Sequence, residues 1–548
     1  MMIRSIILLL LVSVFSGYDK KTVVDSLYIN GTIYTVDAAF SKAEAVAVKD
    51  GKIVAVGKSA ELKKKYTATT TINLQGKFLY PGFIDAHAHF FGYGMDLRTA
   101  NLTGTESWED VLHHLSDFAK GLNAKSGEWI IGRGWDQNDW EIKEFPTNER
   151  LNQIFPDNPV IITRIDGHAA IVNDLAINKS GINASTKLVG GDVLLKDGKP
   201  TGVLIDNAVD LVSANIPAAT EQQVKDGLLA AQKNCFAAGL TTIDDCGLNY
   251  FQVLQLEKYY KSGDLKMRLY VMLSDWKNNY EAIFKRGKIK TDRLNVSSFK
   301  VYADGALGSR GACLLHPYED KPGQYGFLLS NQVHFDSVAR MIYDKGYQMC
   351  THAIGDSGNR MILHVYAKYL KTKNNLRWRI EHAQVINEND FNLFGKYNIV
   401  PSVQPTHATS DMYWAEKRLG PKRVKGAYAF NDLLNQNGWI PLGTDFPVED
   451  IDPIKTFYAS VFRKDAKGWP AEGFQTENAL TREATLRGMT IWAAKSNFEE
   501  NEKGSIEKGK FADFVVLDTD LLTASFQQIL ITKVLKTICG GEIVFSNK

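Results

Sequence analysis

The stretch Pro81–Phe90, PGFIDAHAHF, decides how this chain is interpreted. An apolar run follows a Pro-Gly turn and carries Asp85, His87 and His89 at alternate positions. In an extended strand, residues i, i+2 and i+4 point to the same face, so these three side chains share one side. Two imidazoles on one side suit a divalent metal, whereas for an isolated pair we would favour hydrogen-bonded strand histidines. The rest of the sequence has to decide between these alternatives.

The composition is that of an ordinary folded protein. The chain has 548 residues, of which 44% are hydrophobic and 23% charged, enough for one large barrel with a satellite domain. A net charge of +2 provides no basic field for nucleic acid. We therefore expect a small-molecule substrate and no nucleic-acid partner, and the sequence leaves a homodimer open. The scattered cysteines form no Cys-x-x-Cys pair, so neither a disulfide framework nor a thiolate zinc site is indicated.

The first residues have the layout of a secretory signal. Arg4 precedes an apolar run over 6–15, and Val14 and Ser16 suit the positions before a cleavage site. The run is about half the roughly 20 residues that a membrane-spanning helix needs. Tyr18 stands where a bacterial lipoprotein signal has its lipidated cysteine. The sequence predicts a signal peptide over 1–17 and a periplasmic or secreted bacterial protein without a membrane anchor; a buried first strand is the alternative.

Both ends of the remaining chain are rich in strands, and the middle alternates strand and helix. Residues 25–80 and 501–548 carry β-formers and hairpin signals such as Asp50-Gly51, which predicts one small β-sandwich built from both termini. Residues 81–500 contain eight apolar runs, most of them followed by a helical stretch. This pattern predicts an α/β fold, a (β/α)8 TIM-like barrel whose catalytic groups follow its strands. A doubly wound open sheet is the alternative, but no Gly-x-Gly-x-x-Gly follows an early strand.

One connection in the predicted barrel is far longer than the others. The insertion spans about 95–220, whereas a βα loop usually has about 2–6 residues. Because it leaves the first strand at the catalytic face, we expect it to cover the site as a lid or specificity subdomain. A structural insertion away from the site is the alternative.

Polar residues in four other predicted strands favour the metal-binding interpretation of the histidine pair. Lys300 lies mid-strand among apolar neighbours, where burial lowers the pKa of an amine and a neutral amine can form a carbamate with carbon dioxide. A lysine that reaches the strand end or pairs with Asp304 is the alternative. His352, His382 and Asp445 end later strands, so they converge with His87 and His89 on one barrel mouth. This convergence predicts a metal site.

Five motifs of the chain are PGFIDAHAHF, KVYADGALGSRGA, THAIGD, EHAQ and LGTDFPV. Together they resemble the amidohydrolase superfamily, within it the branch called amidohydrolase family 3, which includes N-substituted formamide deformylase. The resemblance implies a metal-bearing barrel, a flanking β-sandwich and hydrolysis of amide-type C–N bonds other than peptide bonds. It implies two divalent cations, zinc by preference and manganese or iron as alternatives. The implied ligands are His87, His89, carbamylated Lys300, His352, His382 and Asp445, with Asp445 also the catalytic proton carrier.

Five further residues are candidates for substrate binding, each with a structural role as the alternative. Two lie in the insertion, two follow the fourth strand and one follows the seventh: Arg164, His168, Asp304, Arg310 and His407. Trp135, Trp140 and Trp414 either wall the pocket or pack the insertion.

The substrate remains open. The same barrel could act on an ester, a lactone or a cyclic imide, or could belong to a non-catalytic binding protein that has lost its metals.

Overall fold

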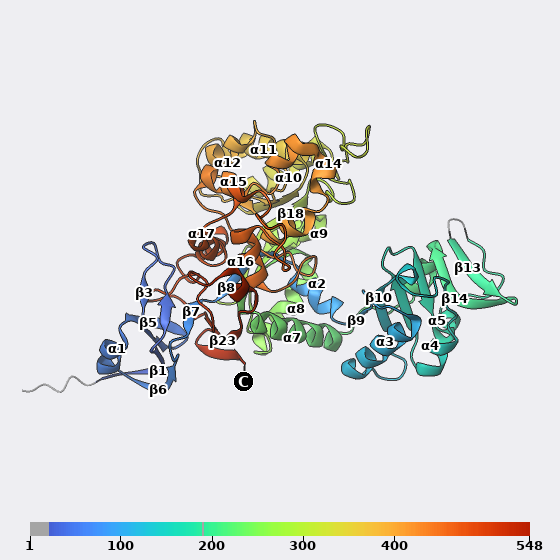
Figure 1. Ribbon diagram of the computed structural model, residues 1–548, viewed down its shortest axis with the longest axis horizontal. Coiled ribbons are helices and arrows are strands. Elements are labelled where there is room, and N and C mark those ends of the chain that lie inside the picture. The colour runs from blue at the N-terminus through green and yellow to red at the C-terminus, as the bar shows by residue number, and fades with distance from the viewer. Residues whose placement is uncertain (1–20, 189–190, 548) are drawn as a thin grey trace, which may run out of the picture.

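The computed structural model describes residues 21–188 and 191–547, so the predicted signal peptide over 1–17 lies outside the described residues. The chain forms a central barrel, a β-sandwich on one side and an inserted subdomain on the other (Figure 1). Among the described residues, no helix is both long and apolar enough to cross a membrane.

The barrel consists of parallel strands that follow the predicted apolar runs. Their order is β21-β20-β19-β18-β16-β15-β8, with a short antiparallel strand, β17 (Ile289–Lys290), beside β18. The strands are β8 (Phe83–Ala88), β15 (Leu240–Leu248), β16 (Arg268–Ser274), β18 (Leu294–Tyr302), β19 (Gln348–Ala353), β20 (Arg379–His382) and β21 (Val400–Ser402).

The eighth position of the barrel is an irregular segment over residues 440–446. Its Gly443 amide donates to the Val403 carbonyl beyond β21 at 3.0 Å, and its Asp445 amide donates to the His87 carbonyl of β8 at 2.8 Å. The segment therefore joins both edges and closes the barrel. The predicted barrel is confirmed, and the open doubly wound sheet is excluded.

Helices cover the outside of the barrel and present their apolar faces to its strands. Large aliphatic and aromatic side chains from strands and helices form one continuous core. The helices are α2 (Phe90–Asp96), α7 (Glu221–Ala237), α8 (Tyr250–Lys261), α9 (Lys277–Arg286), α10 (Gln332–Asp344), α11 (Asp356–Leu370), α12 (Phe391–Tyr397), α13 (Pro405–Asp411), α14 (Ala415–Arg423), α15 (Phe430–Asn437), α16 (Pro453–Phe462), α17 (Arg482–Gly488), α18 (Ile491–Ser496) and α19 (Phe526–Leu530).

Both ends of the chain contribute to the β-sandwich. One sheet has the order β5-β4-β1-β6 and the other β24-β23-β22-β7-β2-β3, so C-terminal β22 pairs with N-terminal β7. The strands are β1 (Thr22–Ile29), β2 (Thr32–Tyr34), β3 (Lys42–Ala43), β4 (Ala45–Lys49), β5 (Lys52–Gly57), β6 (Tyr66–Asn73), β7 (Phe78–Pro81), β22 (Phe514–Leu517), β23 (Val534–Cys539) and β24 (Glu542–Ser546), with α1 (Ser59–Lys65) beside them. Asp50 and Gly51 both have positive φ and form the expected tight turn between β4 and β5.

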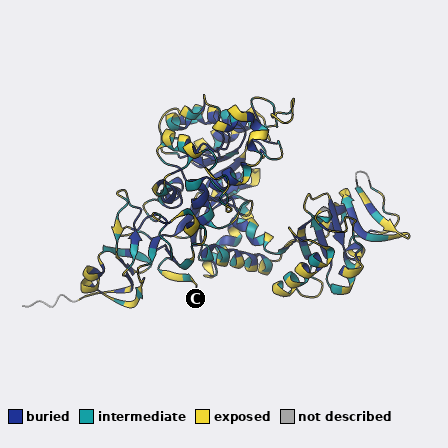
Figure 2. Ribbon diagram, viewed as in Figure 1, coloured by how far each residue is buried: buried dark blue, intermediate teal, exposed yellow. Residues whose placement is uncertain are grey.

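The insertion is a separate α/β body with a mixed sheet of order β13-β14-β12-β11-β10-β9. Its two apolar cores lie apart from the barrel core, and Figure 2 shows buried residues inside both bodies. Its elements are β9 (Thr99–Asn101), α3 (Trp108–Leu122), β10 (Ile130–Trp135), α4 (Glu149–Ile154), β11 (Val160–Arg164), β12 (Ala169–Val172), α5 (Asp174–Lys179), β13 (Gly191–Lys196), β14 (Lys199–Asp206) and α6 (Asn207–Ser213).

The insertion stands beside the barrel and does not cover the mouth of its own barrel (Figure 1). The expectation of a lid folded over the site of the same chain is therefore wrong for this structure. The sequence could not show this, because the direction in which an insertion leaves a barrel depends on the packing of its connecting segments.

Candidate metal centre

Side chains from the carboxyl ends of the barrel strands meet in one buried cluster. Ligand atoms of His87, His382 and Asp445 all lie within 4.8 Å of one another. His382 and Asp445 line a cavity of about 380 Å³ together with His89, Lys300 and His352, and His87 lies fully buried beneath them. The barrel thus brings all the predicted ligands together, as expected for residues at the ends of parallel strands.

His87 and His89 direct their Nε2 atoms toward Asp445. These atoms lie 3.6 and 3.2 Å from Asp445 Oδ1. His89 Nδ1 donates to the carbonyl of Cys246 at 3.0 Å, so its Nε2 keeps a free lone pair. Lys300 Nζ lies 3.1 Å from His87 Nε2. The four side chains lie in one continuous group, in which the two imidazoles and the carboxylate are possible metal ligands.

His352 and His382 form the other side of the cluster, with ring centroids 4.6 Å apart. His382 Nδ1 donates a hydrogen bond to Gln404 Oε1 at 2.7 Å, which leaves Nε2 free. Within the described part of the chain, His352 Nε2 and Asp445 Oδ1 are buried without a hydrogen-bond partner. Buried polar atoms without partners are rare in proteins, and here they belong to metal-ligand residue types. This donor set fits a divalent metal centre.

The protonation of the cluster also suits metal binding. Burial, together with the nearby Lys300 ammonium, lowers the pKa of His87 to about 4 and that of His352 to about 3. Burial alone would raise the pKa of Asp445, but the neighbouring imidazoles hold it well below its usual range. Neutral imidazoles and an ionised carboxylate are the forms that bind cations.

Lys300 differs from the expectation. Burial by itself lowers the pKa of its ammonium, but nearby acidic groups, Cys246 and Tyr302 first and then Glu381 and Asp445, raise that pKa above the ordinary value. The prediction of a depressed pKa is therefore wrong for the side chains as they stand. The sequence showed the apolar strand around Lys300 but not the acidic groups that other strands bring close to it.

Two residues of the cluster have unfavourable backbone conformations. The φ of His382 is 72° and that of Asp445 is 67°. Positive φ is uncommon for residues other than glycine, although Asp adopts it more readily than most. Such strain persists where the surrounding structure fixes it, and it occurs preferentially at functional sites.

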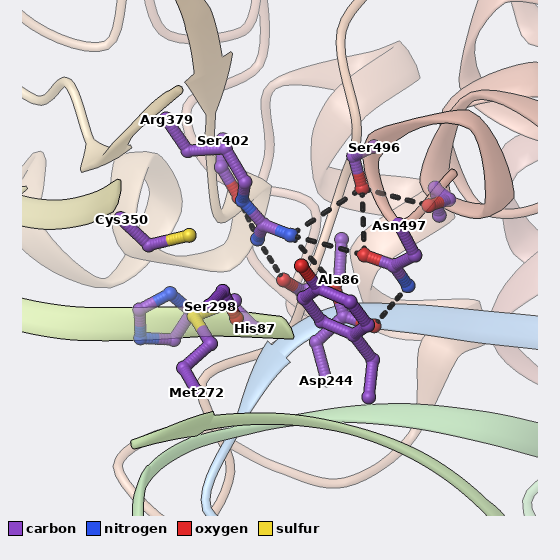
Figure 3. Close-up of polar contacts among 12 residues, drawn as sticks. Ala86, His87, Asp244, Met272, Ser298, Cys350, Arg379, Ser402, Ser496 and Asn497 are labelled. Carbon is purple, nitrogen blue, oxygen red and sulfur yellow. Dashed lines mark hydrogen bonds and ion pairs between the residues drawn. The ribbon is translucent and has the colours of Figure 1, made fainter. Parts of the chain in front are cut away.

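A buried chain of charged groups supports His87 from behind, and Figure 3 shows its part from Arg379 through Asp244 to Asn497. His87 Nδ1 donates to Glu381 Oε2 at 2.6 Å, which directs His87 Nε2 toward the cluster. Arg379 forms ion pairs with Glu381 at 2.6 Å and with Asp244 at 2.7 Å. Asn497 then donates to Asp244 at 2.6 Å. Although burial by itself raises the pKa of Glu381, Arg379 and His87 lower it to about 2, so Glu381 is ionised.

This chain of charges was not predicted from the sequence, although one signal was present. Arg379 and Glu381 occupy alternate positions of the apolar stretch that ends in His382. They therefore lie on the same face of β20, and charged residues are almost never fully buried unless they are paired. That pattern should have indicated an internal ion pair.

The candidate substrate-binding residues fall into two groups. His407 lines the cavity, and its Nε2 lies 3.4 Å from Asp445 Oδ2. Asp304 is buried and accepts backbone hydrogen bonds from Cys313, Ile354 and Gly355, so it anchors loops beside His352. Arg310 pairs with Asp320 outside the cavity lining.

Arg164 and His168 lie in the insertion and outside the cavity of their own barrel. Arg164 pairs with Asp136 and Asp166, and the exposed His168 contacts Asp206. The structure therefore does not bring these two residues to the metal ligands of the same chain, because the insertion stands beside the barrel.

The three candidate aromatic residues also divide. Trp414 lines the cavity, whereas Trp135 and Trp140 are buried in the core of the insertion. Trp135 and Trp140 therefore pack the insertion and do not form a pocket wall.

Comparison with known proteins agrees with this fold and site. The model of the amidohydrolase family matches residues 70–545. The chain belongs to the amidohydrolase family, which confirms the resemblance seen in the sequence. The family and the cluster of metal-ligand side chains together identify the protein as a metal-dependent hydrolase.

Similar proteins span nearly the whole chain. Protein LONG AFTER FAR-RED 3 from Arabidopsis thaliana is 33% identical, over 95% of this chain and 92% of that protein. The putative amidohydrolase YtcJ from Bacillus subtilis is 30% identical, over 95% and 99%. An uncharacterized metal-dependent hydrolase from Pyrococcus horikoshii has a solved structure with a TM-score of 0.76 and 27% identity, covering 91% of this chain and 99% of that one.

Proposed function

We propose that this protein hydrolyses amide-type C–N bonds, other than peptide bonds, in small N-acyl or N-formyl compounds. The observation that carries the proposal is the buried cluster of His87, His382 and Asp445 in an amidohydrolase barrel, with His382 and Asp445 lining a cavity. N-substituted formamide deformylase from Arthrobacter pascens, 25% identical over 95% of this chain and 98% of that protein, supports the choice of bond.

The proposed roles divide the ligands between two cations. His87, His89 and Asp445 would hold one, His352 and His382 the other, and carbamylated Lys300 would lie between them. Such cations activate a water molecule and polarise the substrate carbonyl near neutral pH. Zinc suits the nitrogen-rich donor set, and elemental analysis of the purified protein distinguishes it from manganese or iron.

Asp445 is the proposed proton carrier. Its carboxylate is ionised, and Oδ1 has no hydrogen-bond donor among the described residues. It would accept a proton from the attacking water and deliver it to the nitrogen that leaves. His407, close to the other oxygen, would help to hold the carboxylate in place.

The carbamate of Lys300 would form when neutral Nζ attacks carbon dioxide and releases a proton. Cations held by the neighbouring histidines would favour the neutral amine, because they repel the ammonium. Lys300→Ala should lower the metal content and abolish most activity, and formate or acetate should restore part of the rate. Full metal content and full activity in this variant would show that Lys300 is structural.

The bond specificity can be tested with a panel of N-formyl and N-acyl amines, with release of the free amine as the readout. A lactone, a simple ester and a cyclic imide provide the comparison, because the same cluster could hydrolyse them. Activity should disappear with a chelator and return with added zinc. Hydrolysis of only the oxygen esters would replace the proposed bond class. Protein that purifies without metal although zinc is supplied, and that hydrolyses no compound of the panel, would favour a binding protein.

We also propose that the protein is exported, on the basis of the leader pattern in the sequence. Expressed in a Gram-negative host, it should appear in the periplasm and lack roughly its first 16 residues. Mass spectrometry of the mature N-terminus provides the test, and a cytoplasmic protein that retains its leader would contradict export.

A further inference from the structure

The connection between insertion and barrel is built as a stalk that holds the two bodies apart. Only Leu97 and Arg98 separate α2 from β9. Helices α2 and α7 meet at glycines: a Cβ on Gly227 would lie 2.3 Å from the Gly94 carbonyl oxygen. Beyond this contact, Gln223 at the start of α7 donates to Glu128 of the insertion at 3.3 Å. The close packing of the two helices fixes the point at which the insertion leaves the barrel.

The uncovered mouth of the barrel has an apolar rim. Val448 lines the cavity with 70% of its surface exposed. Tyr413, next to cavity residue Trp414, stacks on Trp469 at 4.8 Å, and about half of each of these two rings is exposed. Phe327 and Leu329 are exposed in the loop that follows β18. An apolar rim of this kind around an active site indicates an interaction surface.

The insertion also carries an exposed apolar surface, which lies beside a polar cluster. At the carboxyl ends of the parallel strands β10 and β11, Arg164 contacts Gln137 at 2.8 Å and Asp136 at 2.5 Å. Ile142, 73% exposed, and Ile165, 46% exposed, follow the same two strands. The carboxyl edge of parallel strands is the usual place for ligand contacts.

We propose that the insertion covers the barrel mouth of a second copy of this chain, where Arg164 contributes to the partner's substrate site. Each chain offers an uncovered apolar rim around Val448 and an exposed apolar surface on the insertion with Ile142 and Ile165. Within one chain these two surfaces lie apart (Figure 1). A two-fold dimer satisfies both surfaces at once, because an isologous contact repeats in both directions. The role of Arg164 rests on the proposed hydrolase function, whereas the assembly itself does not.

The assembly is tested first without any substrate. Light scattering should give the mass of a dimer for the unaltered protein. Ile142→Asp on the insertion and Val448→Asp on the rim should each shift the mass toward that of a monomer. Ile531→Asp provides the matched control, since Ile531 is 72% exposed on the segment after α19 and takes no part in the proposed contact. A monomeric unaltered protein, or dimers unaffected by both rim and insertion variants, would overturn the proposal.

Mixing two defective proteins tests whether the site crosses the subunits. Asp445→Asn has a defective barrel and an intact insertion, and Arg164→Ala has the reverse. After equal amounts of the two proteins exchange subunits, about half of the dimers are mixed. Each mixed dimer has one intact barrel facing one intact insertion, so about a quarter of the unaltered activity should return. No recovery, with exchange verified by native mass spectrometry, would show that each insertion serves its own chain. Full activity of Arg164→Ala alone would exclude its role at the substrate.

Failure of the proposed function would be recognised separately. If no compound of the panel is hydrolysed by the unaltered protein, the mass measurements on the Ile142, Val448 and Ile531 variants still test the assembly.

Discussion

Replacing Asp445 with asparagine tests proton transfer separately from shape, because the two side chains differ only in one carboxylate oxygen. Asp445 Oδ1 faces His87 and His89, and its backbone has positive φ, which Asn adopts as readily as Asp. Asp445→Asn should therefore fold normally and retain most of the bound metal. Turnover should fall by about 10²–10⁴-fold, the usual contribution of a general base. Kinetics together with elemental analysis provide the measurement, and a rate within a few-fold of the unaltered enzyme would mean that another group moves the proton.

Glu381 shows how a residue that touches no substrate can control a metal site. Glu381→Gln keeps the shape but removes the charge that compensates Arg379 and polarises His87. Metal affinity should fall by about 10–100-fold, as for other partners of metal-binding histidines. Competition with a chromogenic chelator measures it, with the exposed Glu388→Gln as the control on the same segment. Unchanged affinity would assign Glu381 to stability alone.

At the scale of elements, the closure of the barrel depends on the close contact between β8 and the segment over 440–446. A Cβ on Gly443 would lie 2.5 Å from the His87 amide nitrogen and 2.8 Å from Asp85 Oδ1. Asp85 itself is held by the Thr444 hydroxyl, which donates to it at 2.6 Å. The aspartate of the opening motif thus fastens the two segments together and is not directed at the metal cluster.

Gly443→Ala should separate these segments, because backbone atoms cannot give way as a flexible side chain can. We expect a loss of about 1–3 kcal/mol in the free energy of unfolding, in the range for overpacking, and weaker metal binding. Gly121→Ala in α3 is the control, since a Cβ there meets nothing within 4 Å. Urea denaturation measures both variants. Equal stability of Gly443→Ala and the unaltered protein would show that the closing segment adapts.

At the scale of the whole molecule, a buried ion pair ties the sandwich to the barrel. Arg268 at the start of β16 contacts Asp513, just before β22, at 2.7 and 3.0 Å. Burial alone would raise the pKa of Asp513, but Arg268 holds it below the ordinary value. A lowered folded-state pKa stabilises the protein above the unfolded pKa of about 3.9, and this contribution is lost as the pH falls through the folded pKa.

Asp513→Asn should therefore lose about 3–5 kcal/mol at pH 7, the usual result of leaving a buried charge without its partner. Below a pH of about 4 the difference between variant and unaltered protein should shrink, because the aspartate itself becomes protonated. Urea denaturation across this range tests the sign. Asp344→Asn removes an exposed carboxylate near Arg340 and should change little at any pH. A difference that grows on acidification would contradict the assignment.

The sequence by itself determined the barrel, its two-ended sandwich and the set of residues at its mouth. Strand alternation and the rule that catalytic groups follow barrel strands are local properties, so PGFIDAHAHF and the later strand ends were sufficient. The tertiary structure decided what depends on distant partners. Glu381 acts through His87 on another strand, acidic neighbours raise the pKa of Lys300, and Asp304 holds loops. The stalk of α2 and α7 directs the insertion away from its own site, because packing between elements, unlike periodicity within them, leaves no pattern in a single sequence.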